Sequence, residues 1–249
     1  MGTPEPSLNL LAVWRGVVRL YGEHWRLLLA AGLIVFVPLG FVEAADTELQ
    51  KSDISTVDEL TAIAVVVVAL GHTVSALLGD VFYSGVVASG AWETRGGQAH
   101  SLREIARTIP WGRLVVVDLL FALVAVVGFL LLIVPGFVFL VWFSISGPVV
   151  KIDRLPPREA LRRSRELVQG SFWRVFAIVI PVLFLTEAAV GAAARLGHSI
   201  GGESLFGEWA SATLAEFVAT PVYAAVVVVL AFELIALERA RLSPSSAGS

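Results

Sequence analysis

Long apolar runs, separated by short polar segments, dominate the sequence. A helix of about 20 apolar residues is long enough to cross a ~30 Å hydrocarbon core, so each run is a candidate membrane span. The pattern predicts six spans, over about residues 27–42, 60–92, 114–134, 137–150, 175–196 and 215–237. We therefore expect an all-α integral membrane protein in which residues 1–249 form a single polytopic domain.

The second run is longer than one bilayer is thick. Residues 60–92 contain no polar turn long enough to separate two spans, so we expect one long helix that is tilted or kinked. Gly79-Asp80 and Gly85 are its expected weak points, because helices bend most readily at glycine.

The fourth run, residues 137–150, is short for a span. We expect a tight turn at Pro135-Gly136 before it and a kink at Gly147-Pro148 within it. A re-entrant loop is the alternative interpretation of this run.

Three polar segments have the period of amphipathic helices, with apolar residues on one side and arginines on the other. They are expected over residues 7–21, 101–109 and 157–169. Ser7, the capping box Ser101-x-x-Glu104 and Pro157 are placed to begin them, and Gly22, Pro110 and Gly170 to end them. Helices of this kind lie in the membrane interface.

The third of these helices has the clearest pattern. Its inner face is expected to be Ala160, Leu161, Ser164, Leu167 and Val168. On the water side, Glu159 with Arg163 and Arg162 with Glu166 are spaced as i,i+4 ion pairs.

Each surface helix is followed by an aromatic and basic anchor and then by an apolar hairpin. The anchors are Trp25 with Arg26, Trp111 with Arg113, and Trp173 with Arg174. We interpret this as an internal repeat: repeat 1 covers about residues 7–95, repeat 2 about 98–153 and repeat 3 about 156–241, with a flexible tail over 242–249. Three parallel copies could pack around a pseudo-threefold axis along the membrane normal. The alternative is that any Trp-Arg pair at an inner interface looks alike.

Charge patterning gives the orientation. The chain is 57% hydrophobic and 16% charged, far from the composition of soluble domains. Of its 18 Lys and Arg, all but Lys51 and Arg195 fall in one alternating set of loops and ends. The positive-inside rule then predicts a multi-pass protein with both termini in the cytoplasm.

Ionisable side chains inside spans are costly and are therefore candidates for function. They are His72, Asp80, Asp118, Glu187, Glu216 and Glu233. His72 and Asp80 are eight residues apart, on one helix face, and could relay protons or bind a cation. The alternative is a structural role, in which Asp80 accepts hydrogen bonds from Ser or Thr on a neighbouring helix. We expect Asp80 and Glu187 to face the bundle interior. Asp118 and Glu233 are expected near the inner interface with structural roles, and Glu216 near the outer surface.

Motifs for catalysis, phosphate binding or metal binding are not found in the sequence. It has no cysteine, no phosphate-binding glycine loop, no hydrolase motif and no metal-ligand spacing among its four histidines. We therefore expect no cofactor and no catalytic site. The basic cluster Arg158, Arg162, Arg163 and Arg165, with Arg174, could hold anionic lipid headgroups or could be a topology signal only.

Residues 131–180 resemble a known family. The Pro-Gly turn, the apolar run and the stretch EALRRSRELVQGSFWR, from Glu159 to Arg174, are similar to the bacterial membrane-domain family named after glycerophosphoryl diester phosphodiesterase. The resemblance implies a bacterial plasma-membrane protein. It does not imply the phosphodiesterase activity, because no stretch here is long enough for that soluble domain.

These observations favour a non-catalytic membrane protein that organises or handles lipid, or that supports a membrane partner or a homo-oligomer. The alternative is a transporter or channel that uses the buried acids along a path. An intramembrane enzyme is a third possibility, and nothing suggests nucleic-acid binding.

Overall fold

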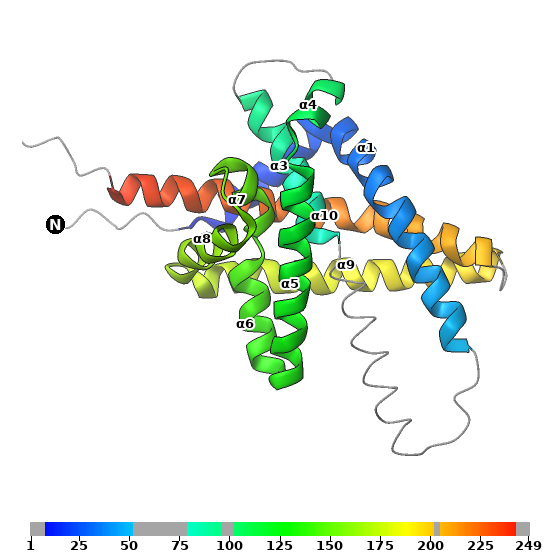
Figure 1. The fold of residues 1–249 in the computed structure, drawn as a ribbon. Coiled ribbons are helices and arrows are strands. Elements are labelled where there is room, and N and C mark those ends of the chain that lie inside the picture. Colours follow the sequence, from blue (N-terminus) through cyan, green and yellow to red (C-terminus); the bar gives the residue numbers. More distant parts are fainter. Residues whose placement is uncertain (1–7, 52–78, 96–101, 202–204, 243–249) are drawn as a thin grey trace, which may run out of the picture.

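The computed structural model describes residues 8–51, 79–95, 102–201 and 205–242 (Figure 1). Within these ranges every regular element is a helix. They are α1 (Leu10–Lys51), α3 (Asp80–Arg95), α4 (Leu102–Thr108), α5 (Trp111–Leu131), α6 (Ile133–Phe143), α7 (Ser146–Ile152), α8 (Pro157–Gln169), α9 (Phe172–Gly201) and α10 (Leu205–Leu242). The all-α prediction is therefore confirmed for the part of the chain described.

Four stretches within the described residues are long and apolar enough to cross a membrane. They are Trp111–Leu131, Val134–Ile152, Phe172–Ala192 and Thr220–Leu242. Much of their apolar surface faces outward; on α5, for example, Leu119, Leu123 and Leu130 are exposed. Exposed apolar surface on this scale marks contact with a membrane or a partner, and the four long apolar helices indicate a membrane-embedded multi-pass protein.

Helix α1 is a single long helix with one kink. Asn9 begins it, because its side-chain oxygen accepts hydrogen bonds from the backbone N–H groups of Leu11 (3.0 Å) and Ala12 (3.4 Å). Ser7, the expected cap, lies outside the described residues. The predicted stop at Gly22 is displaced by two residues: helical geometry is interrupted at His24, where φ is −123° and ψ is 19°, and a second helical stretch then continues to Lys51.

The chain begins α3 at one of the two predicted weak points. Gly79 has φ of 100°, a left-handed conformation that glycine adopts without strain, and the helix starts at Asp80. Gly85, the other predicted weak point, lies inside the unbroken helix. The preceding part of the run, residues 60–78, lies outside the described residues.

The turn between α5 and α6 is one residue long. Leu132 is extended (φ −170°, ψ 150°), so the predicted turn at Pro135-Gly136 is misplaced by three residues. Pro135 instead occupies the first turn of α6, where its missing N–H costs little. Gly128 of α5 lets the two helices touch, because a Cβ there would lie only 3.0 Å from the Gly136 Cα of α6.

The fourth run is broken, as its sequence indicated, but just before Gly147-Pro148. Helix α6 ends at Phe143, and α7 starts at Ser146 after a two-residue interruption. Helix α7 then packs tightly on α3. Gly147 makes this crossing possible, because a Cβ there would overlap the Val81 carbonyl oxygen and lie 2.8 Å from Ser84 Oγ.

Helix α10 forms the centre of the structure. It packs against α1, α9 and α3, and residues 224–231 along it are all buried. Helices α9 and α10 form one antiparallel pair, α5 and α6 another, and the two pairs cross (Figure 1). The internal repeat and its pseudo-threefold packing stay predictions.

The α3–α7 crossing gives a direct test of packing. Replacing Gly147 with alanine should lower the free energy of unfolding by about 1–3 kcal/mol, because the new methyl group meets backbone that cannot move easily. Thermal unfolding in detergent, followed by tryptophan fluorescence, measures the change. Gly191→Ala is the matched control, since nothing lies within 4 Å of a Cβ at that position. Equal destabilisation by both substitutions would contradict the close crossing.

Candidate functional site

Helix α8 is built as the sequence predicted, with one exception. The five residues expected on its inner face are all buried, and Pro157 lies in its first turn with Gly170 at its C-terminal end. Arg162 and Glu166 form the predicted ion pair at 3.6 Å. The predicted pair between Glu159 and Arg163 is wrong, because Arg163 is bonded elsewhere.

Arg163 joins three segments of the chain. Its guanidinium donates a hydrogen bond to Glu238 Oε1 of α10 (2.7 Å), contacts Glu238 Oε2 through a second nitrogen, and donates to Asp153 Oδ2 (3.1 Å). The bond to Glu238 raises the pKa of Arg163 further above its usual value. A bidentate Arg–carboxylate pair is both strong and specific in geometry. Arg163 therefore has a structural role, because its ion pairs hold α8 against the end of α10.

Helix α8 is also held at Trp142, on α6. Ser164 Oγ donates a hydrogen bond to the Trp142 carbonyl oxygen at 2.7 Å. The guanidinium carbon of Arg165 lies 4.5 Å from the centre of the Trp142 ring, a cation–π contact. These contacts leave Arg158, Arg162 and Arg165 exposed along one side of a helix whose position is fixed.

The predicted anchor residues lie on the surface. Trp25, Trp111 and Trp173 are 50%, 37% and 76% exposed, as expected for side chains at a membrane interface. Arg26 lies over the Trp25 ring at 5.3 Å, and Arg113 donates a hydrogen bond to the Arg154 carbonyl oxygen at 3.2 Å. Arg174 is exposed beside Trp173.

Asp118 is buried and makes hydrogen bonds that support the fold. From α5 its two carboxylate oxygens accept hydrogen bonds from the backbone N–H groups of Gly79 (2.8 Å), Val81 (3.2 Å) and Phe82 (3.3 Å). These groups belong to the first turn of α3, where N–H groups lack helical partners and the helix dipole favours a negative charge. Asp118 therefore caps α3 from a neighbouring helix.

The other candidate acids are distributed over several environments. Asp80 is buried at the start of α3, as predicted. Glu187 is exposed on α9, so the prediction that it faces inward is wrong; the buried residue there is its neighbour Thr186, which donates hydrogen bonds within α9. The Tyr223 phenol is buried on α10. His72 and the side chain of Glu216 lie outside the described residues.

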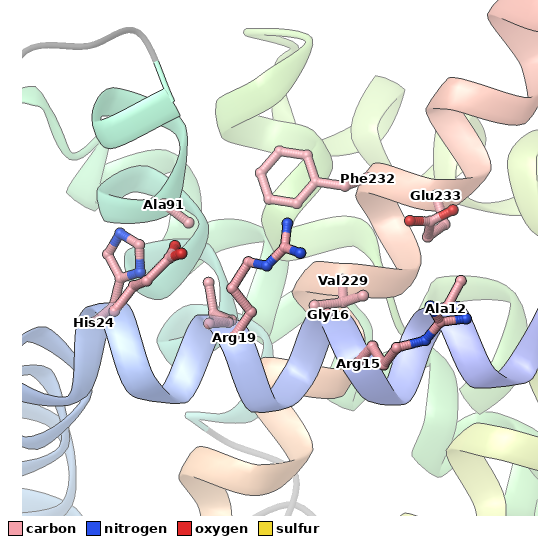
Figure 2. Close-up of a pocket in the computed structure, with 11 residues that line it drawn as sticks. Ala12, Arg15, Gly16, Arg19, His24, Ala91, Val229, Phe232 and Glu233 are labelled. Carbon is pink, nitrogen blue, oxygen red and sulfur yellow. The ribbon is translucent and has the colours of Figure 1, made fainter.

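Glu233 lines a cavity that the sequence did not predict. This cavity, of about 500 Å³, opens between α1, α3 and α10, and Arg15, Arg19, Glu23 and His24 also line it (Figure 2). The sequence feature related to this cavity was the i,i+4 spacing of Arg15 and Arg19. That spacing indicated only the water-exposed face of an interfacial helix. Glu233 is more than 200 residues away, so its place beside them could not be read from the sequence.

Comparisons with protein-family models, curated proteins and solved structures gave no match. The described residues contain no cluster of three or more His, Cys, Asp or Glu that could hold a metal ion. The geometry of the site is therefore the ground for any proposal of function.

The cap by Asp118 leads to a prediction. Asp118→Asn keeps the size of the side chain but replaces one acceptor oxygen with an NH₂ group that faces backbone donors. The free energy of unfolding should fall by about 1–3 kcal/mol. Hydrogen exchange should also become faster at residues 79–82, which distinguishes a lost cap from general destabilisation. Glu159→Gln, at an exposed position on α8, is the control, and unchanged exchange at residues 79–82 would contradict the cap.

Proposed function

We propose that this protein is a non-catalytic membrane protein that handles lipid, and that α8 holds anionic lipid headgroups at the cytoplasmic surface. The proposal rests on the observation that the arginines of α8 have different roles. Arg163 fixes the helix through Glu238 and Asp153, while Arg158, Arg162 and Arg165 remain exposed beside it. A phosphate group near them would gain charge-assisted hydrogen bonds.

Neighbouring residues support this location for headgroups. Trp173 and Arg174, at the start of α9, are exposed and follow α8 directly. Tryptophan prefers the headgroup level of a bilayer, and an arginine beside it would be within reach of phosphate. The exposed Arg162–Glu166 pair contributes little to stability, so a lipid phosphate could replace Glu166 as the partner of Arg162 at small cost.

The proposal includes an orientation and a family. Six spans would place both termini, α4 and α8 on the cytoplasmic side, with all Lys and Arg except Lys51 and Arg195 on that side. The resemblance of residues 131–180 to the membrane-domain family supports a membrane role without hydrolytic chemistry. A membrane partner or a second copy of the chain would fit the same surface less specifically than lipid does.

The experiment compares lipids of different charge. Phosphatidylglycerol added to the detergent-solubilised protein should raise its melting temperature more than phosphatidylcholine does. Changing Arg158, Arg162 and Arg165 together to Gln should remove this extra stabilisation, and high salt should imitate the change because exposed charges are screened within about 8–10 Å.

Two control variants make the result interpretable. Arg195→Gln, exposed at the far end of α9, should leave the response to phosphatidylglycerol intact. Arg163→Gln should lower the melting temperature measured without lipid but preserve the extra stabilisation by phosphatidylglycerol. The reason is that Arg163 holds α8 in place and does not contact lipid. An undiminished response in the triple variant would reduce the cluster to a topology signal.

The second candidate function is transport, and one observation favours it. Asp80 on α3 and Tyr223 on α10 are both buried, and these two helices pack against each other. Buried ionisable groups on separate membrane helices are a recurrent feature of ion paths.

Transport predicts a loss of flux. In vesicles containing the purified protein, an entrapped pH dye should report proton entry driven by a potassium diffusion potential. Asp80→Asn should reduce this flux to that of empty vesicles, whereas Glu166→Gln on α8 should not. If the parent protein gives no flux above that of empty vesicles, the acids serve structure and the transport proposal fails.

A further inference from the structure

The cavity between α1, α3 and α10 has an apolar inner surface, here called its floor, which is formed by buried side chains. Leu20, Ala91, Val229 and Phe232 line it, and the Phe232 ring stacks on Trp92 with centroids 6.1 Å apart and planes 6° apart. Gly16 brings α1 against α10, because a Cβ there would lie 2.7 Å from Val229 Cγ1. The floor is thus set by close packing and does not depend on surface side chains.

The rim of the same cavity carries charges of both signs. Arg15 and Arg19 lie one turn apart on α1, Glu23 follows on the same helix, and Glu233 approaches from α10 (Figure 2). Within the part of the chain that the structure describes, no ion pair joins these arginines to these glutamates. Two cations and two anions around one opening therefore keep their capacity to bind a ligand.

We propose that this cavity binds a phosphate group joined to a primary ammonium group, the chemistry of an ethanolamine phospholipid headgroup. Arg15 and Arg19 would donate hydrogen bonds to the phosphate, as guanidinium pairs do. Glu23 and Glu233 would accept hydrogen bonds from the ammonium. The apolar floor would cover the glycerol and the first methylene groups, and about 500 Å³ is a usual size for a small-ligand site.

The balance of charges favours a zwitterion over a simple anion. An anionic headgroup without an amine would satisfy the arginines but would bring negative charge near two carboxylates, which is unfavourable. A choline headgroup has a cation without N–H groups, so it cannot donate hydrogen bonds to Glu23 or Glu233. An ethanolamine headgroup meets both requirements.

Binding to lipid-stripped protein in detergent tests this assignment. Native mass spectrometry should show short-chain phosphatidylethanolamine binding about tenfold more tightly than phosphatidylglycerol or phosphatidylcholine, the difference expected from one charge-assisted hydrogen bond. Soluble phosphoethanolamine should compete with the lipid if the headgroup alone is recognised. Failure of this competitor would assign binding to the whole lipid, whereas equal binding of the three lipids would overturn the proposal.

Charge-specific variants make the test sharper. Changing Arg15 and Arg19 together to Gln should remove the tighter binding of phosphatidylethanolamine. Changing Glu23 and Glu233 together to Gln should reverse the preference, so that phosphatidylglycerol binds at least as tightly, because two unopposed arginines remain. Arg26→Gln, exposed on α1 but not lining the cavity, should change neither.

Two measurements keep the result independent of folding and of the α8 proposal. The melting temperature without lipid should stay near that of the parent, since these substitutions are on the rim and not on the packed floor. The cavity variants leave Arg158, Arg162 and Arg165 untouched, so the response of α8 to phosphatidylglycerol remains measurable in them. An unchanged preference in the double glutamine variant of the acids would overturn the assignment of the ammonium group.

Discussion

The carboxylate of Asp118 satisfies backbone groups that would otherwise be unpaired inside the bundle. A helix that begins within a membrane protein exposes N–H groups that neither water nor lipid can satisfy, and each costs several kcal/mol in hydrocarbon. Helix α3 begins at Asp80 after a left-handed Gly79, and Asp118 accepts hydrogen bonds from that turn. This cap fixes the place where α3 starts, and α3 in turn supports α7 and one wall of the cavity.

Small residues extend this constraint along the helix. Helix α7 can lie against α3 only because Gly147 leaves room for the Val81 carbonyl oxygen. In hydrocarbon, helices gain little from hiding apolar side chains, so close contact between backbones becomes the main source of attraction. Broken helices such as α6 and α7 are tolerated where the interruption is buried in protein, and Ser144 and Ile145, at the interruption, are both buried.

Local features of this chain could be predicted from the sequence, and long-range ones could not. The buried face of α8 followed from the spacing of Ala160, Leu161 and Ser164, which is a property of one helix. The partner of Arg163 did not follow, because Glu238 is 75 residues away and Glu159 is the local alternative. The cap by Asp118 was hidden for the same reason, since 39 residues separate it from Gly79. The stop expected at Gly22 was displaced to His24, because glycine removes a barrier to ending a helix without fixing the residue at which it ends.

The arginines of α8 and those of the cavity have different neighbours. This difference affects how selectively each surface can bind a lipid headgroup. On α8, Arg163 binds the carboxylates of Asp153 and Glu238, so Arg158, Arg162 and Arg165 remain exposed, with Arg162 paired to Glu166 and Arg165 stacked on Trp142. Such a surface attracts any anionic headgroup and discriminates weakly, because solvent screens its charges. In the cavity, carboxylates stand beside the arginines above an apolar floor, from which a bound headgroup would displace water. Partial exclusion of water strengthens each electrostatic contact and makes an unpaired charge costly. The cavity is therefore the place where this protein could distinguish one headgroup from another. Helix α8, by contrast, could only hold the protein to a charged membrane surface.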